Sequence, residues 1–152
     1  MTISEGNTTR CRRCFNIYRA GRDRRRRRGL HEKDGVQYLT GLLYAPLREE
    51  FSHLSFDKPR EKSILLSTGG TDPYNMAGRI LAYGTQMQEL QDYLWHVIVG
   101  SMNRNEDMLR ELAAANPKII LHKNIPDMWR YMQQCEVAVS AGGTTLLELC
   151  AC

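Results

Sequence analysis

Two glycine turns are the stretches of this sequence whose residue types and spacing could do chemistry. Gly69-Gly70-Thr71 follows the apolar run Ser63-Ile-Leu-Leu-Ser-Thr68, and Gly142-Gly143-Thr144 follows Val137-Ala-Val-Ser140. A buried strand that ends in a glycine turn and continues as a helix presents free backbone N–H groups at the positive end of that helix. That arrangement suits a phosphate group. A single Gly-Gly turn is equally typical of an ordinary strand-to-helix connection.

The helix predicted after the second turn carries an acidic residue near its start. Glu148 lies one turn into this helix, where a carboxylate could accept hydrogen bonds from sugar hydroxyls. We expect Thr144 or Thr145 to cap the helix, because hydroxyl side chains satisfy the free N–H groups of a first turn. The sequence therefore favours a ligand that combines a phosphate with a sugar.

Other chemistry finds little support. No Ser/His/Asp set, carboxylate pair or metal-ligand cluster has persuasive spacing, so we assign no catalytic residue, no metal and no cofactor. His96 and His122 fall at strand ends, and a structural role is the better interpretation for His122. Cys11-Arg-Arg-Cys14 is a lone CxxC pair, whereas a structural zinc site needs four ligands.

Strands alternate with helices from residue 63 onward. We predict strands at residues 63–68, 96–100, 118–122 and 135–140. A helix opens at Asp72-Pro73, with apolar positions running to Leu94 and Gly84 as a weak point. Further helices start near Glu106, at Pro126-Asp127 and after the second glycine turn. This pattern predicts an α/β fold with a Rossmann-like, doubly wound parallel sheet.

The predicted topology brings the two glycine turns together. In a sheet of order 3-2-1-4 the switch point lies between the first and fourth strands, at their carboxyl ends. The strands that end in Gly-Gly are the first and the fourth. Both turns are therefore expected to line one crevice, which favours a phosphate-bearing ligand.

The chain divides into three parts. Residues 1–35 hold 11 Lys and Arg against 4 Asp and Glu, including the run Arg22-Asp-Arg-Arg-Arg-Arg-Arg28, and we expect a disordered basic tail. Nucleic-acid binding through this run is an alternative, but no stacking or groove-reading motif accompanies it. Residues 36–62 are predicted to be a connector, and residues 63–152 the ligand-binding domain.

Composition indicates where the protein works. None of the apolar runs approaches the roughly 20 residues of a membrane span. The amino terminus lacks the apolar segment of a signal peptide, and the five cysteines are an odd number. We therefore expect a cytoplasmic protein without a disulfide framework or a membrane span.

Three motifs resemble a known family. Tyr38-Leu-Thr-Gly-Leu-Leu-Tyr-Ala-Pro-Leu-Arg-Glu-Glu-Phe51 is similar to the connector of the PseG family. These are UDP-2,4-diacetamido-2,4,6-trideoxy-β-L-altropyranose hydrolases of pseudaminic acid biosynthesis, with SpsG-like relatives. Ile64-Leu-Leu-Ser-Thr-Gly-Gly-Thr-Asp-Pro73 and Ala138-Val-Ser-Ala-Gly-Gly-Thr-Thr-Leu-Leu-Glu-Leu149 resemble its two glycine loops. The broader similarity, over residues 36–152, is to the carboxy-terminal domain of MurG-like GT-B glycosyltransferases.

The resemblance implies a site for a UDP-sugar. Gly69, Gly70 and Thr71 would hold the diphosphate together with Gly143, Thr144 and Thr145. Glu148 matches the glutamate that binds ribose hydroxyls, and Ile125 matches the residue whose backbone reads uracil. In the family, water attacks the anomeric carbon and UDP departs.

The chain also departs from the family pattern. The family's amino-terminal domain, which carries the histidine thought to activate water, has no counterpart in residues 1–35. We therefore expect a truncated chain that does not hydrolyse its substrate alone. A MurG-like UDP-sugar-dependent glycosyltransferase is the alternative within the same fold.

Overall fold

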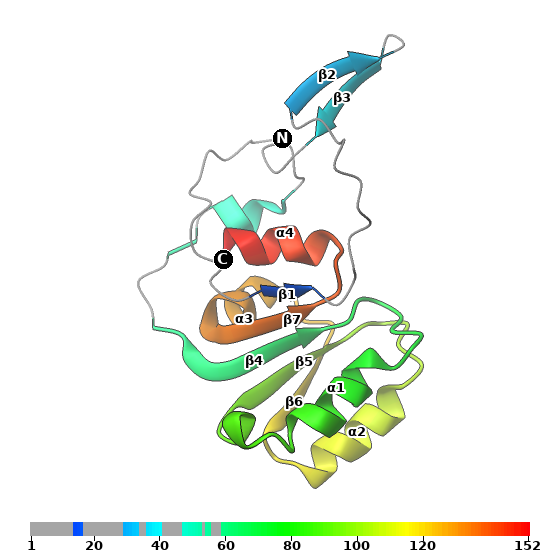
Figure 1. The fold of residues 1–152 in the computed structure, drawn as a ribbon, viewed down its shortest axis with the longest axis vertical. Coiled ribbons are helices and arrows are strands. Elements are labelled where there is room, and N and C mark those ends of the chain that lie inside the picture. Colours follow the sequence, from blue (N-terminus) through cyan, green and yellow to red (C-terminus); the bar gives the residue numbers. More distant parts are fainter. Residues whose placement is uncertain (1–13, 17–28, 34–35, 41–46, 53, 56–58) are drawn as a thin grey trace.

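The computed structural model describes residues 14–16, 29–33, 36–40, 47–52, 54–55 and 59–152 (Figure 1). The strands are β1 (Cys14–Asn16), β2 (Gly29–Lys33), β3 (Val36–Thr40), β4 (Glu61–Ser67), β5 (Leu94–Val99), β6 (Ile119–Lys123) and β7 (Cys135–Ser140). The α-helices are α1 (Met76–Gly84), α2 (Glu106–Ala115), α3 (Met128–Gln134) and α4 (Thr144–Ala151). Two short 3₁₀ helices are η2 (Glu49–Ser52) and η3 (Gln88–Leu90).

A parallel sheet forms the centre of the domain. Its strand order is β1-β7-β4-β5-β6, and every neighbouring pair runs parallel. Strands β6, β5, β4 and β7 reproduce the predicted order 3-2-1-4, so the Rossmann-like α/β fold is confirmed. β1 adds a strand beside β7 that the sequence pattern does not predict.

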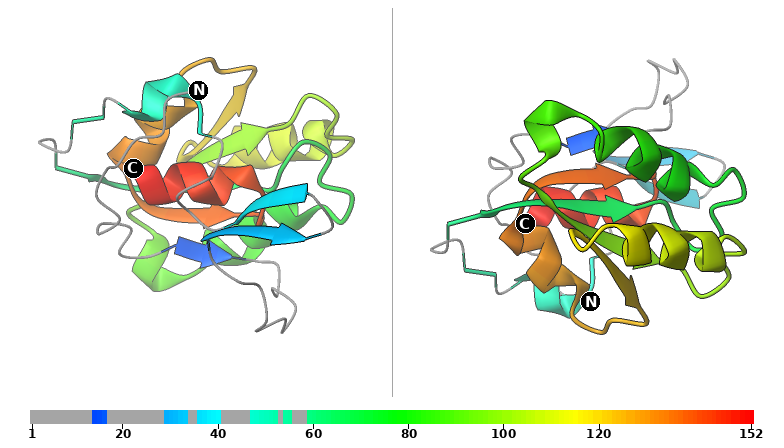
Figure 2. Two further views of the ribbon diagram at one scale, coloured as in Figure 1. Left: turned by 90° about the horizontal axis from the view of Figure 1, so that it is seen from above. Right: turned by 90° about the horizontal axis from the view of Figure 1, so that it is seen from below.

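Helices cover both faces of this sheet, as Figure 2 shows from opposite sides. Alternate β4 residues point to opposite faces, as the pleat requires. Ile64 and Leu66 pack with Leu81 of α1 and Leu109 of α2, whereas Leu65 packs on the other face. The residues that share this second core with Leu65 are Phe51 of η2, Met132 of α3, Cys135, Leu149 of α4 and Cys152.

The first helix is shorter than its apolar spacing predicts. α1 ends at Gly84, and the chain turns through η3 before Leu94 begins β5. A Cβ at Gly84 would lie 2.6 Å from Cη2 of Trp95, which is buried in the core. The extension of the helix to Leu94 was therefore wrong, because the chain must turn back toward the sheet where Gly84 meets Trp95. Pro73 also lies before the helix, which begins at Met76.

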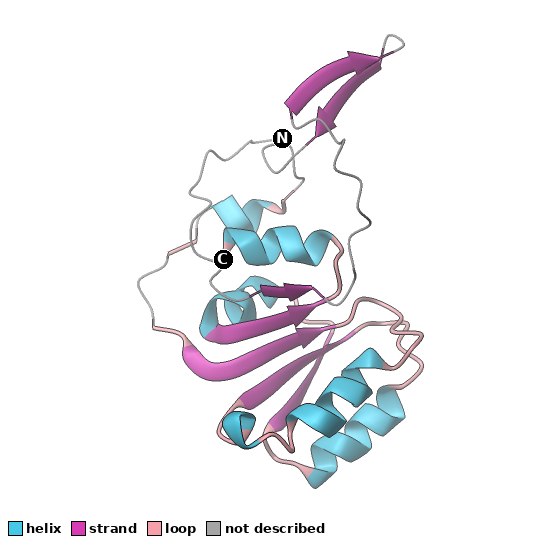
Figure 3. Cartoon of the chain, viewed as in Figure 1, coloured by secondary structure: helices cyan, strands magenta, loops and turns pink. Residues whose placement is uncertain are grey.

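The amino-terminal third of the chain contributes only short described elements. β2 and β3 form an antiparallel pair (Figure 3), and its register places Gly29 opposite Thr40. The arginine run at residues 22–28, with the nucleic-acid alternative that it motivates, lies outside the described residues. The same holds for most of the predicted tail and for Cys11. In the part of the chain that the structure describes, no helix is long and apolar enough to cross a bilayer.

Candidate functional site

The two glycine turns leave the sheet side by side. Ser67, the last residue of β4, lies opposite Ser140, the last residue of β7. The Ala141 N–H donates to the Ser67 carbonyl oxygen at 2.9 Å, so the pairing continues into the second turn. The structure therefore brings the two turns to one carboxyl edge, as the predicted topology requires.

The first turn is open to solvent. Gly69, Gly70 and Thr71 are exposed, and a Cβ on either glycine would meet no atom within 4 Å. Gly69 has φ +88°, a conformation that side chains rarely adopt. The loop after β5 supports the turn from behind, since the Met102 N–H donates to the Gly70 carbonyl at 3.3 Å. Space for a ligand therefore lies on the outer side of this turn.

The helix after the first turn is capped by the protein itself. Asp72 Oδ1 accepts from the Met76 N–H at 2.7 Å, and Oδ2 accepts from the Ala77 N–H at 2.9 Å. Asp72 is buried, with φ +39°. These bonds occupy N–H groups that a phosphate would need at this helix end. The sequence placed Asp72 near the start of this helix but did not indicate that its carboxylate caps it.

The second helix end is different. Gly143 is the N-cap of α4, and no side chain of the described residues bonds to the first turn of this helix. The prediction that Thr144 or Thr145 caps it was therefore wrong. Gly143 is exposed, and a Cβ there would meet no atom within 4 Å. Thr144 is exposed and Thr145 half-buried. Of the two turns, this is the one whose helix N-terminus no described side chain occupies, although the Gly143 N–H itself donates to the Ala141 carbonyl oxygen at 2.8 Å.

Glu148 lies one turn further along α4 and is held by a distant residue. Its Oε1 accepts from Arg48 Nε at 2.9 Å, and only 13% of its side chain is exposed. Arg48 also pairs with Glu50 at 2.9 Å and stacks over the Phe51 ring. Arg48 belongs to the connector motif, but nothing in the sequence pattern indicates its contact with Glu148.

Ile125 lies at another part of the carboxyl edge. It is half-buried in the loop between β6 and α3, next to Asn124 with φ +56°. β6 is separated from β7 by β4 and β5, and three strand spacings amount to roughly 14 Å. Ile125 and Glu148 therefore follow different strands of the same carboxyl edge, Ile125 after β6 and Glu148 on the helix after β7.

The two histidines of β5 and β6 face each other. His96 Nδ1 lies 2.9 Å from His122 Nε2, and Tyr131 of α3 packs on both rings. Burial is the main cause that lowers the pKa of both imidazoles, and the charge of His96 lowers that of His122 further. This arrangement fits the structural interpretation given to His122.

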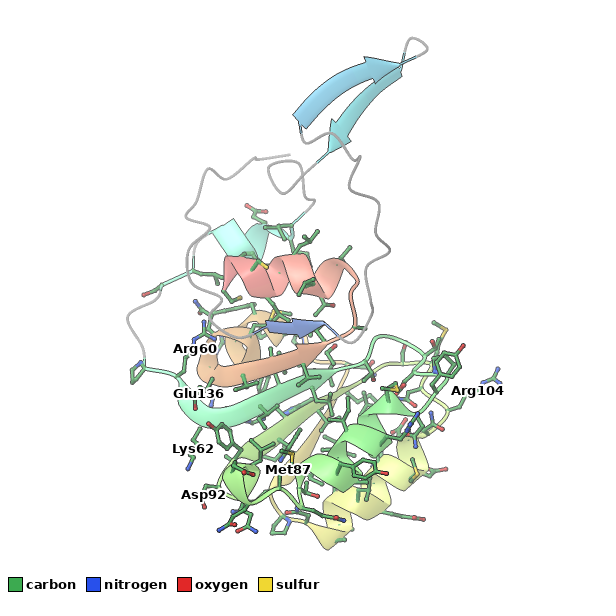
Figure 4. All side chains as sticks on the ribbon, in the orientation of Figure 1. Arg60, Lys62, Met87, Asp92, Arg104 and Glu136 are labelled. Carbon is green, nitrogen blue, oxygen red and sulfur yellow. The ribbon has the colours of Figure 1, made fainter. Side chains whose placement is uncertain are left out.

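The described cysteines and acidic groups offer no other centre. Burial raises the pKa of Cys135 to about 11 and that of Cys152 to about 12, so both thiols stay protonated near neutral pH. In the described ranges, no group of three or more His, Cys, Asp or Glu residues could hold a metal ion. Figure 4 shows Lys62, Asp92 and Glu136 at the amino end of the sheet, away from Arg104 at the carboxyl edge. The Lys62–Asp92 ion pair therefore belongs to the opposite end from the glycine turns.

Fold and site together define a Rossmann-like α/β domain whose two glycine turns lie at the carboxyl ends of β4 and β7. No family model matches the chain. It is 29% identical to the uncharacterized protein MJ1062 of Methanocaldococcus jannaschii over 137 residues, which are 84% of this chain and 28% of that protein. It is 27% identical to the spore coat polysaccharide biosynthesis protein SpsG of Bacillus subtilis over 104 residues, which are 63% of this chain and 31% of that protein.

These similarities support the SpsG-like part of the resemblance. The matched region spans less than a third of the length of either relative.

Proposed function

We propose that this chain binds the UDP moiety of a nucleotide sugar for an enzyme of polysaccharide biosynthesis. The observation that carries the proposal is the arrangement of the carboxyl edge. The N-terminus of α4 at Gly143, which no described side chain caps, lies beside the open turn at Gly69, and Glu148 follows one helical turn later. Such a helix end favours a diphosphate, and the carboxylate favours ribose hydroxyls.

The two turns have unequal roles in this proposal. Because Asp72 occupies the amino end of α1, the first turn offers only the backbone of Gly69, Gly70 and Thr71. The end of α4 takes most of the negative charge. Ile125, which follows β6 at the same carboxyl edge, would take the base that is bonded directly to the ribose.

For the reaction we propose hydrolysis of the UDP-sugar, as the PseG resemblance implies. Water attacks the anomeric carbon, the bond to the diphosphate oxygen breaks, and UDP departs. Fixed N–H donors at α4 would stabilise the charge that develops on this leaving group. We assign binding rather than water activation to the described residues, since His96 and His122 point at each other.

A calorimetric titration with UDP, using CMP as the control nucleotide, tests the proposal. We expect UDP to bind selectively and Glu148→Ala to weaken that binding by roughly tenfold or more, the effect of losing hydrogen bonds to a charged group. Glu106→Ala is the matched control. Glu106 is also a helical glutamate that forms ion pairs, with Arg110 and Lys123, but it lies on α2. A folded sample that binds neither nucleotide would overturn the proposal.

A further inference from the structure

Arg48 and Glu148 are 100 positions apart in the sequence and meet through their side chains. Arg48 Nε donates to Glu148 Oε1 at 2.9 Å, while Arg48 Nη1 lies 2.9 Å from Glu50 Oε1. The guanidinium carbon lies 5.1 Å from the centre of the Phe51 ring. Phe51 is only 6% exposed and packs in the same core as Leu149 of α4. The connector therefore fixes Arg48 from two directions and presents it to α4.

Glu148 is the more buried member of this ion pair. Its side chain is 13% exposed, against 44% for Arg48. A carboxylate that has lost most of its water needs a hydrogen-bond partner to offset that loss, and the guanidinium supplies one. The pairing also restrains a flexible side chain to one orientation. It uses Oε1, and no other donor in the described part of the chain reaches Glu148, so Oε2 is free to accept from a ligand.

We propose that Arg48 is a positioning residue for nucleotide recognition. It holds Glu148 in the orientation in which the free carboxylate oxygen accepts from a ribose hydroxyl of UDP. This inference rests on the proposed function and deepens it, because it assigns sugar recognition to a pair formed between the connector and α4. A guanidinium suits the role because its nitrogens form a rigid fork that can engage Glu148 and Glu50 together, which the single ammonium of a lysine does less well.

The test compares UDP with 2′-deoxy-UDP by calorimetry on the whole 152-residue chain. We expect the unmodified protein to prefer UDP by about tenfold, the effect of one hydrogen bond to a charged group. Arg48→Ala and Arg48→Met should both reduce this preference to about threefold or less, because Glu148 loses its orientation. Arg48→Lys should retain an intermediate preference. Arg110→Ala is the matched control, since Arg110 pairs with Glu106 on α2, and it should keep the full preference.

The ratio of the affinities for UDP and 2′-deoxy-UDP distinguishes a positioning role of Arg48 from a purely structural one. A purely structural role for Arg48 would weaken both nucleotides equally and leave the ratio unchanged, which would overturn the inference. In a Glu148→Ala background, the further change Arg48→Ala should leave the ratio where it is. If the unmodified, folded chain does not bind UDP, the proposed function falls as well. If UDP binding depends on Glu148 but the ratio survives Arg48→Ala and Arg48→Met, this inference falls alone. Circular dichroism of each variant verifies its fold. If Arg48→Ala and Arg48→Met unfold, the nucleotide preference of Arg48→Lys is compared with that of the unmodified protein.

Discussion

Asp72 Oδ2 accepts a hydrogen bond from the backbone N–H of Ala77 at 2.9 Å, and its other oxygen accepts from Met76. The carboxylate therefore takes the position at the amino end of α1 that an anionic ligand would otherwise occupy. This relationship explains why two glycine turns at one edge of the sheet can differ in function. One helix end is closed by the Asp72 carboxylate, and no side chain of the described residues caps the other.

The cap makes Asp72 a stability residue. Asp72→Ala removes two charge-assisted hydrogen bonds at a helix N-terminus, and we expect a loss of about 2 kcal/mol in the free energy of unfolding. Asp72→Asn should lose less, because its amide retains one acceptor and asparagine tolerates the positive φ. Urea denaturation measures both variants. A change below about 0.5 kcal/mol for Asp72→Ala would show that the cap contributes nothing.

Arg60 is expected to stabilise the packing of α3 and α4 on the sheet. Its guanidinium donates to the carbonyl oxygens of Met132, Cys135 and Cys152 at 3.2, 2.8 and 2.9 Å. Arg60→Ala should reduce the free energy of unfolding by about 1–2 kcal/mol, because carbonyls at the ends of these elements lose a charged donor. Arg60→Lys should not restore it fully, since one ammonium cannot reproduce the fork.

The control for Arg60 is Arg79→Ala, which removes an exposed arginine of α1. We expect this control to stay within about 0.5 kcal/mol of the unmodified protein in the same urea experiment. Equal losses for Arg60→Ala and Arg79→Ala would contradict the specific role of Arg60.

Position 84 requires glycine, because a side chain there would collide with the Trp95 ring. A Cβ at this position would lie 2.6 Å from Cη2 and 2.8 Å from Cζ2 of the indole ring. Alanine ordinarily favours a helix, but here we expect Gly84→Ala to destabilise the fold by about 1–3 kcal/mol through overpacking. Tryptophan fluorescence during denaturation reports both the stability and the altered ring environment. Gly70→Ala is the control, because its Cβ would meet no atom within 4 Å; an undisturbed Gly84→Ala variant would show that the ring can move aside.

Acid should destabilise the domain through the histidine pair. Burial lowers the pKa of His96 and His122 below the ordinary value of 6.5, with a partial opposing effect of Glu61 on His96. The unfolded chain therefore binds more protons than the folded one, and stability is lost as the pH falls below 6.5. Each excluded proton contributes a slope of up to about 1.4 kcal/mol per pH unit.

Urea denaturation between about pH 7.5 and pH 5.5 measures that slope. This pH range lies above the one in which carboxylates ordinarily titrate. His122→Gln removes one titrating group but keeps a polar side chain opposite His96. We expect the variant to show a clearly shallower slope. A slope that is unchanged in His122→Gln would assign the acid sensitivity to other groups.

The sequence predicted the order of the four strands because buried strands and helices alternate so regularly after residue 63. It could not predict the end of α1, since Met87 and Leu90 continue the helical spacing after the chain has turned at Gly84. The contact between Arg48 and Glu148 was also out of reach, because a pair 100 positions apart leaves no periodic signal. The shared edge of the two glycine turns was accessible because topology alone determines it. The cap formed by Asp72 could not be predicted from the sequence, because it depends on the orientation of a side chain and not on the order of the strands.

The most direct test of the central claim is a map of backbone amide shifts in ¹⁵N-labelled protein as UDP is added. We predict that the amides of Gly143, Thr144 and Thr145 shift most, together with those of Gly69 and Gly70. The amides of Met76 and Ala77, held by Asp72, should change little. The largest shifts at Met76 and Ala77, or shifts confined to residues away from the carboxyl edge, would contradict a diphosphate site at the amino end of α4.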